Sequence, residues 1–115
     1  MAIDTLVINR EIGADTSPIR YFDITLTGDD AYPTGGTADI ESVLRGLLED
    51  ARTRFGSLSN LRLLSVDNTH AAATYALYFD RVNNKLLVRA LADNAEVANA
   101  TDLSASTFRL LTTWG

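Results

Sequence analysis

Residues 19–27 alternate apolar and polar side chains with a period of two. Phe22, Ile24 and Leu26 fall on one face of this segment, and polar residues occupy most of the other. The pattern is typical of a half-buried β-strand, because successive side chains of a strand point to opposite faces of its sheet. It therefore predicts a strand that buries one face in the core.

Residues 38–54 change to a helical period. Their apolar side chains recur at spacings of three and four residues and form one stripe, which comprises Ile40, Val43, Leu44, Leu47, Leu48 and Ala51. Thr37 is the expected N-cap of this helix, and Gly56 is the expected residue just beyond its C-terminus. The polar residues expected on its solvent side are Glu41, Arg45 and Glu49, with an ion pair between the first two.

The remaining apolar segments are short and indicate strands, over residues 3–8, 61–66, 74–79, 85–91 and 106–114. The loops expected between them include 10–18 and 92–105. Asn83 and Asn84 tolerate the positive φ angles of a tight hairpin turn. One helix among many strands excludes a βαβ series and favours a mainly β fold. We expect a β-sandwich or barrel of about six to eight strands, with the helix over about 38–54 inserted.

The length of 115 residues suits one domain over 1–115, in which residues 1–18 are a candidate extended N-terminal arm. The net charge of −5 and the absence of a basic cluster argue against a nucleic-acid partner. The chain has no cysteine, which excludes disulfides, thiolate nucleophiles and cysteine-bound zinc. Neither a signal peptide nor an apolar run long enough to span a membrane is expected.

The turn YPTGG (32–36) before the helix raises the question of a phosphate-binding loop. It lacks the lysine and the glycine spacing of such loops, and Asp29 and Asp30 would repel an anion. We expect a structural turn with Gly35 and Gly36 at positive φ. His70 is the only histidine, and a metal site built on it would lack further nitrogen or sulfur ligands. We expect no catalytic residue, metal or cofactor.

Aromatic and apolar side chains leave three questions open. Trp114 either covers the end of its own core or anchors a neighbouring chain. Tyr75 and Tyr78 could form a stacking platform for a sugar, although packing in a core or a subunit interface is favoured. Apolar residues lie on both faces of residues 85–91, so either the helix or a second copy of the chain must cover one of them.

Three segments together resemble small tailed-bacteriophage proteins of the capsid decoration (cement, head-stabilising) family. They are YPTGG (32–36), YALYFDRVNNKLLV (75–88) and AEVANATDLSASTFRLL (95–111). They match a Y-P-T-G-G turn, an aromatic-rich hairpin ending in N-G-K-L, and an E-V-x-x-G-T-D-L-S-x-x-T-x-R segment. The chain departs from this pattern at Asn84 and Ala100, where glycine is common, and in the length of its helix.

The resemblance implies an all-β, jelly-roll-like domain that is not an enzyme. Such a protein is made in the cytoplasm of the bacterial host. It binds the major capsid protein on the outside of the virion as a homo-oligomer, with a trimer favoured over a dimer, and stabilises the shell. The candidate subunit or capsid contacts are Ile3, Leu6, Ile8, Tyr32, Pro33 and Trp114. The alternative is a head-fibre or tail-associated ligand- or carbohydrate-binding β-module that uses Tyr75 and Tyr78.

Overall fold

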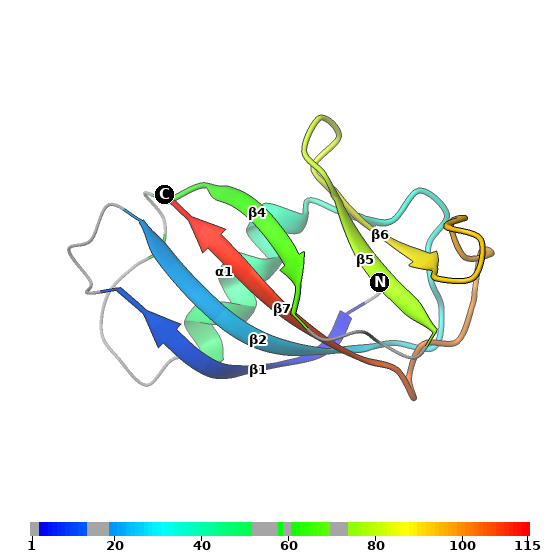
Figure 1. Cartoon of the computed structure of the whole chain (residues 1–115), viewed down its shortest axis with the longest axis horizontal. Coiled ribbons are helices and arrows are strands. Elements are labelled where there is room, and N and C mark those ends of the chain that lie inside the picture. Colours follow the sequence, from blue (N-terminus) through cyan, green and yellow to red (C-terminus); the bar gives the residue numbers. More distant parts are fainter. Residues whose placement is uncertain (1–2, 14–18, 52–57, 59–60, 70–73) are drawn as a thin grey trace.

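The computed structural model describes residues 3–13, 19–51, 58, 61–69 and 74–115. These residues form a mainly β fold with two open antiparallel sheets and one helix (Figure 1). The elements are β1 (Ile3–Ile12), β2 (Arg20–Gly28), β3 (Thr37–Ala38), α1 (Ile40–Ala51), β4 (Leu63–Asn68), β5 (Tyr75–Asp80), β6 (Lys85–Ala90) and β7 (Thr107–Trp114). The mainly β class with one inserted helix is thus confirmed.

The larger sheet has the strand order β1-β2-β7-β4. Alternate residues of β2 are buried, as the period of two predicts, and they face buried residues of β7. Leu26 lies opposite Phe108, and Ile24 lies opposite Leu110. The last strand along the chain therefore occupies the middle of the sheet, next to β2 and β4.

β1 is longer than the sequence predicts. It pairs with β2 up to Ile12, so the expected loop is wrong for residues 10–12, and residues 3–12 belong to the sheet rather than to an extended arm. The polar pair Arg10-Glu11 suggested a loop, but Glu11 has a structural role. It forms an ion pair with Arg20, whose side chain is buried. Burying that guanidinium requires a charged partner.

α1 lies across one face of the four-stranded sheet (Figure 1) and buries Ile40, Leu44 and Leu48 against the core. Val43 and Leu47 pack beside them and are partly exposed, so the predicted apolar stripe is confirmed. Ala51 is exposed at the end of the helix. Residues 52–54 and Gly56, the expected C-terminal part of the helix and the residue beyond it, lie outside the described residues.

The predicted N-cap is wrong. Thr37 belongs to β3 and pairs with Leu86, so it cannot begin the helix. Asn84, at the end of the β5–β6 turn, supplies the cap instead. Its carbonyl accepts from the backbone N–H of Ile40 at 3.1 Å, and its side-chain oxygen accepts from the N–H of Glu41 at 3.1 Å. Two of the N–H groups that a helix start leaves without partners are thereby satisfied.

The smaller sheet has the order β3-β6-β5, and a turn over residues 81–84 joins β5 to β6. Asn84 takes the expected positive φ of 54°, whereas Asn83 does not. The side chain of Asn68 on β4 links the two sheets, because it donates to the Leu77 carbonyl at 2.9 Å and accepts from the Leu77 N–H at 3.1 Å. The Asn68 amide thus forms the pair of hydrogen bonds with β5 that the backbone of a neighbouring strand would otherwise form.

Candidate binding surface

The three segments that carry the resemblance meet around Tyr32. Its buried hydroxyl donates to Glu96 Oε2 at 2.6 Å and accepts from the Val88 N–H at 3.3 Å. Its backbone N–H donates to the Thr101 carbonyl at 3.0 Å, and its carbonyl accepts from the Ala100 N–H at 2.7 Å. Tyr32 therefore joins the YPTGG turn, the β5–β6 hairpin and the segment 95–111 in one hydrogen-bonded unit.

The glycine turn beside Tyr32 is a structural joint, as expected. Gly35 and Gly36 have φ angles of 87° and 91°, and the Gly36 N–H donates to the Pro33 carbonyl at 2.9 Å. A Cβ at Gly36 would lie 2.5 Å from the Leu86 carbonyl oxygen, so only glycine fits there. The Gly35 N–H, which an anion would need, donates to Glu96 at 3.0 Å. The protein's own carboxylate thus takes up this donor.

Shifted pKa values in the described residues have structural causes. Burial and, secondarily, the hydrogen bond to Glu96 raise the pKa of Tyr32. Arg109 donates to both oxygens of Asp23, at 3.2 and 2.9 Å, and lowers the pKa of that carboxyl. Hydrogen bonds within turns lower the pKa of the other two shifted carboxyls, which are Asp80 beside Asn83 and Asp102 beside Ser104. These groups cap turns or cross-link strands and do not face a common substrate.

Histidines and carboxylates form no group of three that could hold a metal ion within the part of the chain that the structure describes. His70 lies outside the described residues, so its setting stays a prediction. The described residues also include no helix long and apolar enough to cross a membrane.

Three of the six predicted contact residues are buried in the chain's own core: Ile3, Tyr32 and Trp114. Trp114 has 0% exposure, its indole N–H donates to Thr112 Oγ1 at 3.1 Å, and the Arg45 guanidinium lies 5.8 Å from its ring centroid. Trp114 therefore covers its own core and does not anchor a neighbouring chain. The contact prediction is therefore wrong for these three side chains, because a partner cannot reach them.

The other three predicted contact residues keep partly exposed side chains: Leu6, Ile8 and Pro33. Leu6 and Ile8 pack against the core from the edge strand β1. A contact of their exposed parts with a partner stays a prediction.

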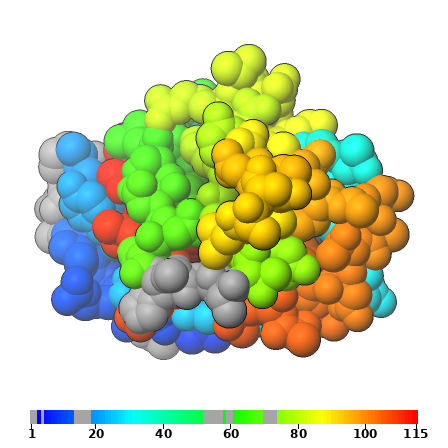
Figure 2. Space-filling model, turned by 45° about the vertical axis from the view of Figure 1, so that its right-hand side comes forward, coloured from blue at the N-terminus to red at the C-terminus, as the bar shows by residue number. Residues whose placement is uncertain are grey.

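Large apolar side chains that are exposed lie elsewhere among the described residues. Val82 at the tip of the β5–β6 turn is 93% exposed, and Tyr78 on β5 is about half exposed. Figure 2 shows this tip as a projection at the top of the molecule. Leu91, which is also about half exposed, lies just beyond the opposite end of β6. A second group lies near β1, and it comprises Val7, Ile12 and Ile19. The sequence signal for Val82 was a β-branched apolar residue within the turn Arg81–Asn84, where polar residues are the rule.

Tyr75 and Tyr78 do not form a two-ring platform. They lie on opposite faces of β5, and Tyr75 packs against the core. Tyr78 is exposed, with the Arg89 guanidinium 4.4 Å from its ring centroid. The alternative that uses both tyrosines for a sugar or another ligand therefore has no support from their positions.

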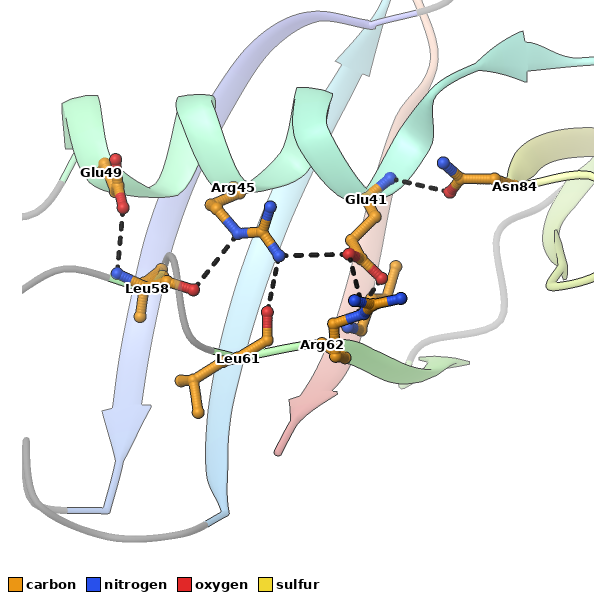
Figure 3. Close-up of polar contacts among 8 residues, drawn as sticks. Glu41, Arg45, Glu49, Leu58, Leu61, Arg62 and Asn84 are labelled. Carbon is orange, nitrogen blue, oxygen red and sulfur yellow. Dashed lines mark hydrogen bonds and ion pairs between the residues drawn. The ribbon is translucent and has the colours of Figure 1, made fainter.

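A polar network lies beneath α1 (Figure 3). Arg45 donates to the carbonyls of Leu58 and Leu61 at 3.2 and 2.5 Å and to Glu41 at 3.1 Å. Glu41 also accepts from the Leu63 N–H at 3.3 Å. The predicted ion pair is confirmed, but the predicted solvent side is wrong for Glu41 and Arg45, whose side chains are about one-fifth exposed. Backbone groups of Leu58, Leu61 and Leu63 cover them.

A cleft of about 320 Å³ opens beside this network, between the start of β4, the end of β5 and the first turn of α1. We refer to it as the β4–β5 cleft, and its lining residues are Glu41, Arg62, Leu63, Leu64, Phe79, Arg81 and Asn84. None of the predicted contact residues lines it. Comparisons with protein-family models, with curated proteins and with solved structures found no match for this chain.

Proposed function

We propose that this chain is a capsid decoration protein of a tailed bacteriophage. It binds the major capsid protein on the outer surface of the virion as a homo-oligomer, with a trimer favoured, and stabilises the shell. The observation that carries the proposal is the convergence of the three resembling segments around Tyr32. Segments that a family shares are expected to meet in its fold, whereas chance matches would be scattered over the molecule.

We also propose that the two sheets together form a jelly-roll-like fold. Its support is that all paired strands among the described residues are antiparallel. The proposal also includes an exterior position on the capsid, which the net charge of −5 favours, because DNA would repel an acidic protein from the interior.

The contact surface that we assign to the capsid or to a second copy is the outer part of the β5–β6 hairpin. Val82 at the tip and Tyr78 on β5 expose apolar surface there. Exposed apolar patches commonly mark protein interfaces. Many identical weak contacts on one shell add up to tight attachment, so each contact can be small.

The test adds the purified chain to undecorated heads of a phage that encodes it. Symmetric, saturable occupancy by cryo-electron microscopy and an oligomer by native mass spectrometry are expected. Val82→Asp is expected to weaken binding about tenfold or more, because it places an uncompensated charge in the contact. Ser42→Asp adds the same charge at an exposed position of α1 and serves as the matched control. A chain that stays monomeric and leaves the heads bare would refute the proposal.

A further inference from the structure

The β4–β5 cleft has fixed walls. Asn68 bonds both backbone groups of Leu77, which holds β4 beside β5 at one end. At the other end Arg81 on the hairpin turn donates to the Leu64 carbonyl of β4. The hydrogen bonds from Ile40 and Glu41 to Asn84 hold the first turn of α1 against the same hairpin turn. The cleft is therefore formed before any ligand arrives, which limits the entropy cost of binding.

The charges in the cleft favour an anion. Two arginines and one glutamate line it. Glu41 is already neutralised by Arg45 at 3.1 Å, and its contact with Arg62 Nε is longer, at 3.4 Å. The Arg62 side chain is 78% exposed and lies beside Glu41 (Figure 3), and no hydrogen bond joins its Nη groups to the described residues. Arg81 is exposed and bonds to the protein through a single Nη group. The cleft thus holds surplus positive charge in a chain of net charge −5.

The apolar residues that line the rest of the cleft determine which kind of anion fits best. Leu63, Leu64 and Phe79 give it an apolar side. A volume of about 320 Å³ falls at the lower end of the range of small-molecule sites. Guanidinium groups bind planar carboxylates with paired hydrogen bonds. An organic acid therefore fits better than an inorganic anion, since its carbon skeleton can contact the apolar wall.

We propose that the β4–β5 cleft binds the carboxylate of an organic acid, with Arg62 and Arg81 holding the carboxylate and Phe79 contacting its apolar body. The acid is either a free small molecule or an acidic side chain that another protein presents beside apolar residues. The proposal is independent of the capsid role, because the isolated chain contains all the residues that it needs.

The first test is an NMR titration of the isolated chain with 3-phenylpropionate. Saturable shifts are expected at the amides of Leu64, Arg81 and Asn84. The neutral isostere 3-phenylpropanamide tests the need for charge, and inorganic phosphate tests the need for the apolar wall. Both are expected to bind at least about tenfold more weakly. Equal binding of either probe would overturn the proposal, and so would shifts that lie elsewhere in the chain.

Variants test the two arginines. Arg62→Ala is the primary variant, because the exposed side chain contributes little to folding, and it is expected to weaken 3-phenylpropionate binding about tenfold. Arg81→Gln removes the second charge and keeps a donor for the Leu64 carbonyl, with a similar loss expected. Arg10→Ala removes an equal charge from β1 and is expected to change nothing. Unchanged affinity in both cleft variants would overturn the proposal.

A final comparison separates the two sources of the acid. The probe is a capped peptide, acetyl-Leu-Asp-Leu-amide, titrated under the same conditions. Tighter binding of the peptide than of 3-phenylpropionate would assign the cleft to an acidic segment of a protein, and the reverse order would assign it to a free acid. Absence of binding by both probes would overturn the proposal.

Discussion

Replacing Tyr32 by phenylalanine tests the hydrogen-bonded unit that joins the three segments. The change keeps the buried ring and removes only the hydroxyl. The Val88 N–H then loses the acceptor that it has at 3.3 Å, and Glu96 loses a donor at 2.6 Å. An unsatisfied buried donor costs about 1–3 kcal/mol, while the exposed Glu96 can bind water instead. We expect Tyr32→Phe to lower the free energy of unfolding by about 2 kcal/mol.

The same variant has a signature in alkaline solution. Burial and Glu96 raise the pKa of Tyr32 in the folded chain above the value of about 10 in the unfolded chain. The stability that the raised pKa contributes is therefore complete below pH 10 and is lost as the pH rises above it. The loss reaches about 1.4 kcal/mol at pH 11. Tyr32→Phe lacks this titration, so the stability difference between the two proteins is expected to shrink by that amount between pH 9 and pH 11.

Urea unfolding, followed by circular dichroism at pH 7, 9 and 11, measures both effects. Tyr21→Phe is the matched control, since its hydroxyl forms no hydrogen bond with the described residues, and a change within about 0.5 kcal/mol is expected for it. A loss below about 0.5 kcal/mol for Tyr32→Phe, or a stability difference that does not vary with pH, would refute the assigned hydrogen bonds.

Two further substitutions test the N-cap correction and the link between the sheets. Thr37→Val removes a buried hydroxyl that has no hydrogen-bond partner among the described residues, so urea unfolding is expected to show a gain of about 1 kcal/mol; a loss of similar size would restore Thr37 as the helix cap. Asn68→Ala leaves both backbone groups of Leu77 without their partner, at a cost of about 2 kcal/mol and with faster hydrogen exchange at the Leu77 amide. Unchanged exchange at that amide would contradict the link.

The sequence predicts best those features that depend on local periodicity. Phe22, Ile24 and Leu26 are buried as their alternation indicates, and Ile40 and Leu44 lie on the buried stripe of α1. These predictions succeed because one period decides which face of a strand or helix turns toward the core. The period does not predict which other elements pack against that face to complete the core.

The failures arise where distant segments meet. The cap of α1 comes from Asn84, 43 residues after Glu41, so no local pattern could identify it. Arg45 occupies a helix face that would be solvated in an isolated helix, but the carbonyls of Leu58 and Leu61 cover it. The contact prediction failed for Trp114 for a related reason, since this side chain fills the core that its own strand completes. Its two alternatives could be separated only by the packing of the whole chain.

The place of β7 in the larger sheet affects how the protein can be made. This strand lies between β2 and β4, yet among the strands that the structure describes it is synthesised last. Until residues 107–114 leave the ribosome, the sheet lacks its centre, and β2 has no partner on one side. The apolar face of β2 then depends on α1 and β1 for cover, and the emerging chain exposes surface that favours aggregation. Folding of this domain is therefore completed only after translation has passed its last strand.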